Sequence, residues 1–363
     1  MKKAVKLAKK KFEKSLAKGA KKNPKAFYSY LKKKTANKVS VGPLMDGDSL
    51  VTDDSEMAEL LNNFFCSVFT SENLHDMPEP EQLFTGDEPL TEARFEPDEV
   101  KKKLVKLKPS AAPGPDGVWT RILHKMADVL AKPLSLIFTK LFADGCVPAI
   151  WKKANVCPLF KKGVKGDTGN YRPVSLTCVI GKVMESLLRD RIIKHLVLHQ
   201  LIRASQHGFM LGRSTLTNLL AYLESLTALV DEGHAVDVLY LNFAKRFDKV
   251  PHARLIAKCR CMGIGGKVLS WVEKQLSGRQ QRVVLIGKFS GWADVGSGVP
   301  QGSVLGPTLF VIFINDIDCA VDVTGSVLLK FADDTKWAMV IDTEEQSQAF
   351  QEGIHRLEEW SRE

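Results

Sequence analysis

The chain has 363 residues, 44% of them hydrophobic, so it is long enough to bury the cores of about two domains. Its seven cysteines include no CxxC pair and no Cys/His ligand spacing, so the sequence supports neither a disulfide framework nor a zinc site. No secretory signal precedes the first basic run, and the most apolar window, Leu309 to Ile317, is too short to span a bilayer. We therefore expect a soluble, intracellular protein without a membrane partner.

The net charge of +10 is concentrated at the N-terminus. Residues 1–40 contain 15 Lys and a single acidic residue, Glu13, so this segment carries +14 and leaves −4 for the rest of the chain. Such a run is typical of a polyphosphate-binding arm, a nuclear-import signal or a solvated helix face. We favour nucleic acid as the partner, because lysine contacts to phosphate need no defined geometry.

The first 95 residues read as a basic, mainly helical extension that ends in a linker. The expected elements are, in order, a helix over 2–22 with a thin apolar stripe, a short helix opened by Pro24 with Phe27, Tyr28, Tyr30 and Leu31, a loop over 36–52, a helix from Met57 to Val68 capped by Asp53 or Asp54, and a linker over 74–92.

The remaining residues alternate irregularly between helices and strands. The expected elements are a helix from Asp98 to Pro109, a rigid loop over 110–118, helices over 119–130 and 133–144, a strand over 154–160 that Lys161, Lys162 and Gly163 extend, an extended piece over 169–176, helices over 181–199 and 216–229, a strand over 236–243, a hairpin over 282–295, a loop over 296–307, a helix over 309–317 and a last helix over 344–361. Because this order includes an antiparallel hairpin and has no regular repeat, the fold class is α+β.

Two adjacent carboxylates, Asp333 and Asp334, stand between two short apolar runs. Val327 to Phe331 leads in and Trp337 to Ile341 leads out, which predicts a β-hairpin with the acids at its tip. A lone Asp-Asp is also a common solvated turn, because Asp bonds its own backbone there. The rest of the chain decides between that turn and a metal site.

Five stretches, read together, point to a polymerase. They are Asn170–Ser175, Ser205–Phe209, Tyr240–His252, Ser297–Pro307 and Lys330–Lys336. With these stretches the chain, from about residue 20 onward, resembles the reverse transcriptase of non-LTR (LINE-type) retrotransposons, especially the jockey and chicken-repeat branches.

The resemblance implies a right-hand polymerase fold with fingers and palm only, in which an antiparallel palm sheet packs on helices. On this reading residues 1–95 are the basic extension, 96–205 are fingers-like and 206–363 are a palm that stops before a thumb. The family's partners would be an RNA template, a DNA primer and dNTPs. The location would be the nucleus, the cytoplasm or both.

The chemistry of nucleotidyl transfer explains why such enzymes need paired acids. Two Mg²⁺ ions about 3.5–4 Å apart stabilise both the attacking and the leaving oxygen, and Mg²⁺ prefers carboxylate ligands. By resemblance, Asp333 and Asp334 are catalytic metal ligands for two Mg²⁺ ions, for which Mn²⁺ can substitute. The family's third ligand is an Asp at the end of the first palm strand.

In this sequence that third position is Asn242. An amide oxygen can touch Mg²⁺ but supplies no formal charge, so the resemblance predicts a copy with impaired catalysis. Asp248 follows six residues later and matches a separate acidic position, so we do not expect it to compensate. Arg246 stands where the family usually has Ala, which is another departure from the pattern.

Further roles carry over by resemblance. The incoming triphosphate would be bound by Lys161, Lys162 and Arg172. An arginine suits this role because its guanidinium group matches the geometry of phosphate oxygens. For Lys162, an ordinary surface lysine is an equally good interpretation. Phe247 would exclude the sugar 2′-hydroxyl, with an ordinary core Phe as the alternative. Gln301 and Gly302 would lie beside the templating base, where a missing side chain permits close approach, or form a simple tight turn.

Three functions remain open at this point. The first is an RNA-directed DNA polymerase, active or formerly active. The second is a non-catalytic nucleic-acid-binding relic that keeps the fold and the basic arm. A nuclease or phosphatase with paired carboxylates is a third, but the sequence offers no further acids or histidines at suitable spacing.

Overall fold

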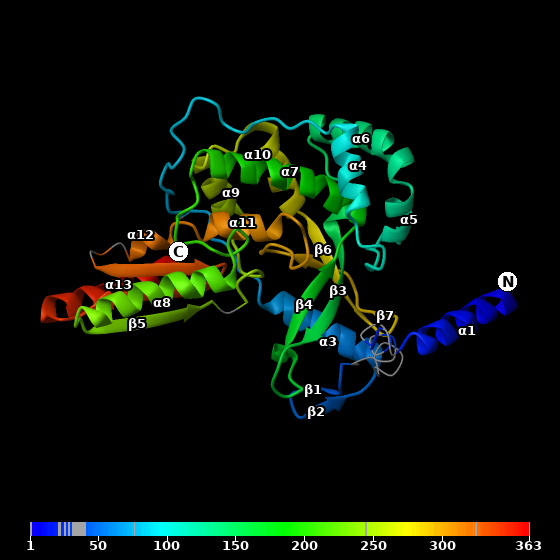
Figure 1. Ribbon diagram of the computed structural model, residues 1–363, viewed down its shortest axis with the longest axis horizontal. Helices are drawn as coiled ribbons and strands as arrows, with labels where there is room; N and C mark the ends of the chain where they lie inside the picture. Colours follow the sequence, from blue (N-terminus) through cyan, green and yellow to red (C-terminus); the bar gives the residue numbers. More distant parts are fainter. Residues whose placement is uncertain are drawn as a thin grey trace.

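The computed structural model describes residues 2–20, 23, 24, 27, 30, 41–75, 77–243, 245–321, 323 and 325–362 (Figure 1). Its elements are α1 (Lys2–Lys18), β1 (Leu44–Asp46), β2 (Ser49–Val51), α3 (Asp54–Ser67), α4 (Pro97–Val105), α5 (Thr120–Lys125), α6 (Ala127–Ala143), η1 (Ala149–Lys152), β3 (Lys153–Phe160), η2 (Thr168–Asn170), β4 (Tyr171–Leu176), α7 (Val179–Leu198), α8 (Thr215–Asp231), β5 (Val236–Asn242), α9 (His252–Cys261), α10 (Gly266–Leu276), β6 (Arg279–Leu285), β7 (Lys288–Phe289), β8 (Ala293–Val295), α11 (Gly306–Phe313), α12 (Ile317–Ala320), β9 (Ser326–Phe331), β10 (Asp334–Val340) and α13 (Glu344–Arg362). Helices and sheets are mixed, which confirms the α+β class.

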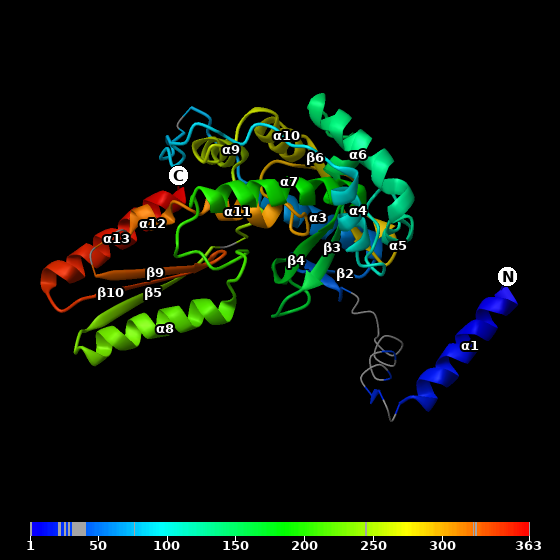
Figure 2. The ribbon, with the colours of Figure 1, turned by 45° about the horizontal axis from the view of Figure 1, so that its top comes forward.

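One antiparallel sheet has the strand order β5-β10-β9. Figure 2 shows this sheet as a layer between α8 and α13. On the α13 side, the buried Trp337 of β10 stacks on Phe350 with ring centroids 4.4 Å apart. A Cβ at Gly353 would come within 2.3 Å of the Trp337 ring, so only glycine lets α13 approach this closely. On the other face, Asn218 of α8 donates to the carbonyl of Lys330.

A second sheet has the order β4-β3-β6-β7, with β8 pairing on β6. It is mixed, because β3 runs antiparallel to β4 but parallel to β6. Helix α3 covers it and buries Met57, Leu61 and Phe65 in a small core shared with Val156 and Val283. Residues expected to form only an N-terminal extension therefore contribute to this core.

The larger core lies among the helices. Residues of α4, α6, α7, α9, α10 and α11 meet there, with Phe138, Leu188 and Trp271 fully buried. This core continues to Trp337 of β10, so it joins the helices to the three-stranded sheet. Within the described residues, no helix combines the length and the apolar content that crossing a membrane requires.

The sequence predicts most of the regular elements, with four corrections. Strand β3 ends at Phe160, so Lys161–Gly163 does not extend it. Residues 44–51, expected within a loop, form the β1–β2 hairpin. The two helices over 119–144 divide at Met126, and Pro133, expected at the start of the second helix, lies inside α6. Helices α9 and α10 were not expected at all.

The expected linker over 74–92 is bound to the body of the protein. The Phe84 backbone amide donates to Cys261 at the end of α9, and the Leu90 amide donates to Gly263. The Phe84 side chain is buried.

The short helix expected after Pro24 lies in part outside the described residues, including Tyr28 and Leu31. The domain boundaries at 95 and 205 stay predictions.

Candidate polymerase cleft

The acidic pair lies at the tip of the β9–β10 hairpin, as the sequence predicts. Phe331 and Asp334 are paired, so Ala332 and Asp333 form a two-residue loop. Ala332 has φ of +57°, the left-handed conformation that short hairpin loops require. Asp333 is buried and Asp334 is exposed. The hairpin thus presents one carboxylate from the turn and one from the start of β10.

Gln206, a residue to which sequence reasoning assigned no individual role, holds the tip of this hairpin. Its Oε1 accepts hydrogen bonds from the backbone amides of Ala332, at 2.9 Å, and Gly208, at 2.7 Å. Its side chain is 1% exposed. The backbone of Lys330 also pairs with both Ser205 and His207. The signal that could have found Gln206 is its place in the Ser205–Phe209 stretch, which packs on the hairpin.

Asn242 lies directly opposite Asp334 in the β5–β10 pair. Directly opposed residues of an antiparallel pair have Cβ atoms about 4.5–5.5 Å apart. Sheet register, rather than proximity in sequence, therefore brings Asn242 beside the acids. The resemblance placed the third ligand at this position, and the structure brings that residue to the site.

Arg246 reaches into the same place from the turn after β5. Its Nη1 forms an ion pair with Asp333 Oδ2 and lies 3.7 Å from Asp334 Oδ1. The same nitrogen donates to Asn242 Oδ1 at 3.3 Å. Asp333 Oδ2 is buried and accepts no hydrogen bond from the described residues, so the charge of Arg246 compensates for its burial. Sequence reasoning noted Arg246 as a departure but did not place it among the acids.

Two basic residues reach the cleft of the acidic pair from the β3 and β4 strands. Arg172 projects from β4 and is exposed, and Lys161 follows the end of β3. Both side chains line the cleft that holds the acidic pair, whereas Lys162 is exposed and does not line it. The structure therefore brings Lys161 and Arg172 to the site and leaves Lys162 outside its lining.

The loop before α11 lies between the two sheets and contacts both β4 and the segment that follows β5. The Ser175 backbone amide of β4 donates to the Gln301 carbonyl at 2.8 Å. Gly302 has φ of +113°, and a Cβ there would lie 2.7 Å from the Ser175 carbonyl oxygen. The Gln301 side chain donates to both oxygens of Asp248, at 3.0 and 3.1 Å. Burial raises the pKa of Asp248 to about 6, although these hydrogen bonds oppose the shift.

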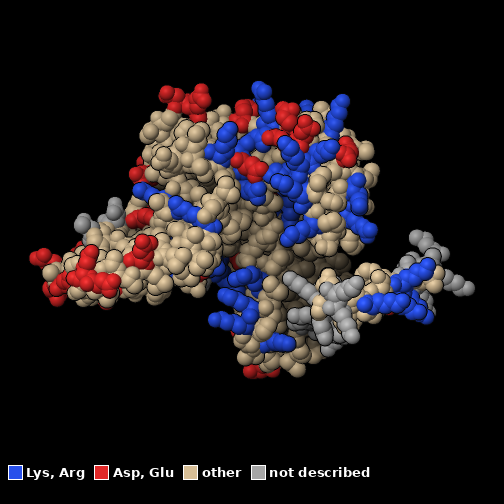
Figure 3. All heavy atoms as spheres, in the orientation of Figure 1, with Lys and Arg blue, Asp and Glu red and all other residues tan. Residues whose placement is uncertain are grey.

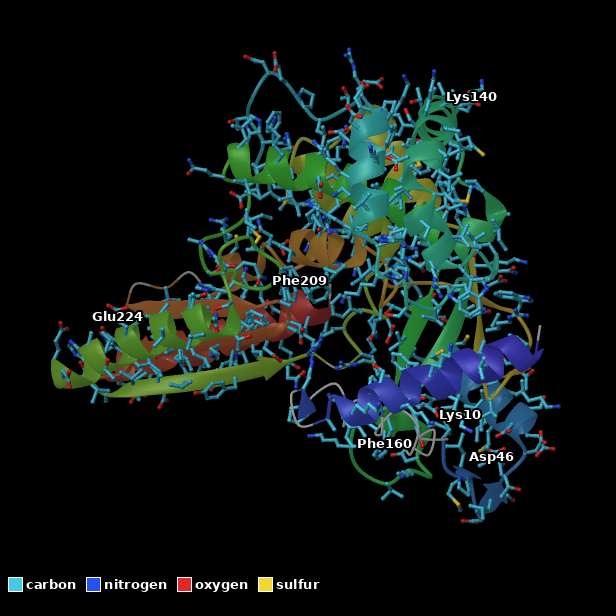
Figure 4. The ribbon with its side chains drawn as sticks, turned by 45° about the vertical axis from the view of Figure 1, so that its right-hand side comes forward. Lys10, Asp46, Lys140, Phe160, Phe209 and Glu224 are labelled. Atoms are coloured by element: carbon cyan, nitrogen blue, oxygen red, sulfur yellow. The ribbon has the colours of Figure 1, made fainter. Side chains whose placement is uncertain are left out.

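Phe247 lies between the core and the cleft. Its ring is 4.7 Å from that of Phe310 and 6.5 Å from that of Phe209. Figure 4 shows Phe209 beside the tip of the β9–β10 hairpin. Phe247 is half-buried and lines the cleft, so it is both a packing residue and a wall of the site.

A single cleft of about 710 Å³ joins these groups. Its lining contains every predicted site residue except Lys162: Lys161, Arg172, Asn242, Phe247, Gln301, Gly302, Asp333 and Asp334. Lys245, Arg246, Asp248 and Phe209 line it too. His207 is not part of the lining and instead contacts Thr217 at the start of α8.

Charge is distributed unevenly on the face drawn in Figure 3. Basic side chains gather over β4 and the β3–β4 connection, and acidic ones gather at the far ends of α8 and α13. Lys162 and Lys165 are exposed in that connection. The approach to the cleft from the β4 side is therefore positively charged.

The donor set does not fit two Mg²⁺ ions as it stands. The oxygens of Asn242, Asp333 and Asp334 that converge here all face Arg246 Nη1. Among the described residues, no group of three or more His, Cys, Asp or Glu side chains is placed to hold a metal. A guanidinium and an amide stand where a strong divalent site needs carboxylates and space.

Comparison with known proteins identifies the family. The family model described as reverse transcriptase (RNA-dependent DNA polymerase) matches residues 159–363. The chain is 30% identical over 274 residues to the RNA-directed DNA polymerase from mobile element jockey of Drosophila funebris, an alignment that covers 73% of this chain and 30% of that protein. It is 32% identical over 245 residues to the jockey polymerase of Drosophila melanogaster, covering 66% and 26%.

The chain belongs to the reverse transcriptase family. Its relatives are the polymerases of non-LTR retrotransposons, including the probable RNA-directed DNA polymerase from transposon X-element of Drosophila melanogaster, at 29% identity over 77% of this chain and 31% of that protein. These matches confirm the resemblance to the jockey branch. The chain spans about a third of the length of the relatives it matches.

Proposed function

We propose that the chain is the fingers and palm part of an RNA-directed DNA polymerase whose catalysis is impaired in this copy. In this assignment residues 96–205 belong to the fingers, 206–363 to the palm and 1–95 to the basic extension. The β5-β10-β9 sheet is the palm sheet, with α8 and α13 on its two faces. The single observation that supports this proposal best is the cleft that gathers the predicted site residues from five separate segments of the chain.

The substrates are an RNA template, a DNA primer and dNTPs. Arg172 and Lys161 contact the triphosphate from the β3–β4 side, because guanidinium and ammonium groups pair with phosphate oxygens. Their place in the lining of the same cleft as Asp333 and Asp334 supports this role. Lys162 is assigned a weaker contact with backbone phosphate outside the cleft. The intracellular location, in the nucleus, the cytoplasm or both, stays a prediction.

Three further residues shape the nucleotide pocket. Phe247 restricts the space at the sugar 2′ position, supported by its ring packing on Phe310, which prevents it from swinging back. Gln301 and Gly302 hold the loop beside the templating base. The contact of Gly302 with β4 supports this assignment, because a side chain there would push the loop away from the strand.

Asp333 and Asp334 are the catalytic pair, and binding of two Mg²⁺ ions, or of Mn²⁺, stays a proposal. With Asn242 in the third position, the site offers two carboxylates. Metal ions would supply charge stabilisation of the transferring phosphoryl group. This chain's own residues bind the triphosphate, exclude water with Phe247 and hold the acids at the hairpin tip through Gln206.

The experiment is RNA-templated extension of a DNA primer with Mg²⁺ or Mn²⁺. We expect the natural chain to extend the primer at least about 100-fold more slowly than the double variant Asn242→Asp/Arg246→Gln, which restores a carboxylate and removes the guanidinium paired with the acids; removing one transition-state contact costs this much in other enzymes. Asp333→Asn serves as the inactive control. Extension by the natural chain as rapid as by the double variant contradicts the impairment.

A second candidate, a non-catalytic nucleic-acid-binding relic, is favoured by one observation. Arg246 is paired with both acids of the hairpin, which leaves a cleft with neutralised carboxylates and a basic rim. A relic binds an RNA–DNA duplex but extends no primer even as the double variant Asn242→Asp/Arg246→Gln. Binding without extension in both proteins therefore separates this candidate from the impaired polymerase.

A further inference from the structure

One nitrogen of Arg246 lies among three oxygens from three points of the chain. Nη1 contacts Asp333 of the hairpin turn, Asp334 of β10 and Asn242 of β5. A divalent ion held by the same three side chains would compete with Nη1 for these oxygens. The guanidinium therefore stands in the position that a metal ion needs.

The site is built around this cation. The Asp333 side chain is 4% exposed and that of Arg246 is 24% exposed, so their ion pair is largely removed from water. A buried carboxylate left without a partner is strongly disfavoured. Within the described part of the chain, Arg246 is the only basic side chain in ion-pair contact with Asp333 or Asp334.

Asn242 fits the arginine better than it fits a metal. Its amide oxygen accepts a hydrogen bond from Nη1 and adds no negative charge. With two carboxylates facing one guanidinium, the cluster carries −1; an Asp at 242 would leave −2 and a stronger demand for a second cation. The amide at 242 and the arginine at 246 thus form one matched pair, four residues apart across the turn after β5.

We propose that Arg246 is a tethered cation that takes the place of the divalent ion, so that Asp333 and Asp334 bind metal tightly only when its charge is removed. This rests on the proposed function in one respect, the assignment of Asp333 and Asp334 as the metal-binding pair. The proposal goes beyond that assignment, because the loss of the carboxylate at position 242 is then only one of two causes of weak metal binding. Full reversal requires changes at both positions, whereas removing the charge of Arg246 reverses part of the effect.

Metal binding is measured directly by the loss of the free Mn²⁺ electron paramagnetic resonance signal on titration of the protein. The variants are Arg246→Gln, which keeps length and hydrogen bonding but not charge, and Arg246→Lys, which keeps charge. Asn242→Asp is tested alone and combined with Arg246→Gln. Arg189→Gln is the matched control, because Arg189 pairs with the carboxylate of Asp190 on α7, outside the cleft.

We expect Arg246→Gln to bind Mn²⁺ at least about 10-fold more tightly than the natural chain, and the double variant to bind more tightly still. Arg246→Lys and Arg189→Gln should match the natural chain. Melting temperature, recorded with and without Mn²⁺, gives a second readout: Mn²⁺ should raise it for Arg246→Gln and leave the natural chain unchanged.

Two results overturn the proposal in different ways. Equal, measurable affinity of the natural chain and Arg246→Gln shows that the guanidinium does not compete with metal, and leaves the metal assignment intact. No binding by the double variant, with a cooperative melt that shows it is folded, removes the metal-binding assignment of Asp333 and Asp334 and the tethered cation with it.

Discussion

Asn242 and Asp334 are directly opposed in the β5–β10 pair, and Arg246 bridges both side chains. The register of a three-stranded sheet therefore determines which residue completes the acidic pair. A shift by one residue would turn Asn242 to the other face of the sheet. The departure at 242 consequently lies inside the site and is not a surface change.

Gly302 should not tolerate a side chain. Gly302→Ala places a Cβ against the Ser175 carbonyl in a conformation that L-residues rarely adopt. We expect a loss of about 2–4 kcal/mol in the free energy of unfolding, combining backbone strain and a clash. Gly212→Ala is the matched control, because Gly212 also has positive φ, +75°, but no atom within 4 Å. Urea unfolding of both variants makes the comparison, and equal losses would show that the contact with β4 is unimportant.

Gln206 should determine the stability of the hairpin tip. Gln206→Leu leaves the amides of Ala332 and Gly208 without their buried acceptor. We expect a loss of about 2–4 kcal/mol in unfolding free energy and faster hydrogen exchange at the Ala332 amide. Gln348→Leu, on the exposed face of α13, should change stability by less than about 0.5 kcal/mol. Unchanged hydrogen exchange at the Ala332 amide would argue against a role of Gln206 in holding the hairpin tip.

Asp248 should make stability depend on pH. Burial raises its pKa to about 6, so the folded protein holds a proton that the unfolded chain, with a pKa near 3.8, has released. Stability from this group is therefore present below pH 4 and is lost as pH rises to about 6. Asp248→Asn, which keeps an oxygen for Gln301, should remove this decline, of roughly 3 kcal/mol.

The pH effect is measured as the difference in unfolding free energy between the natural chain and Asp248→Asn, at pH 4.5 and at pH 7. The variant should gain relative to the natural chain at pH 7. A difference that does not change with pH would show that Asp248 titrates as it does in the unfolded chain.

The basic segment should supply most of the non-specific affinity for nucleic acid. Deleting residues 1–40 removes a charge of +14. We expect weaker binding to single-stranded RNA and a shallower dependence of affinity on salt, because each phosphate contact contributes about −0.7 to the slope. Fluorescence anisotropy at several salt concentrations measures both quantities. An unchanged slope would exclude the segment from RNA binding.

Local sequence signals were sufficient for the acidic hairpin. Apolar runs on either side of two acids specify a two-residue loop without help from distant residues. Helices α9 and α10 were missed because each begins without a side-chain cap, at Pro251 and Gly265, and neither has an acidic residue in its first turn. The strongest helix-start signals are therefore absent.

The contacts of Arg246 and Gln206 could not be predicted from sequence pattern. Both are single polar residues outside the helices and strands, Arg246 in a turn and Gln206 in an isolated β-bridge. Nothing in their spacing indicates a partner about 90 or 130 residues later in the chain, because only the tertiary structure brings the hairpin to them. The resemblance could nominate Asn242 because it lies in a motif, but it could only describe Arg246 as a departure. The structure explains the two substitutions together.

The most direct test is a single-turnover assay of one-nucleotide incorporation into a DNA primer on an RNA template, with protein in excess over the duplex so that binding does not limit the rate. The natural chain, Asn242→Asp, Arg246→Ala and the double variant are compared in Mg²⁺. We predict that the double variant incorporates fastest, by more than the product of the two single effects. A natural chain as fast as the double variant would contradict the account.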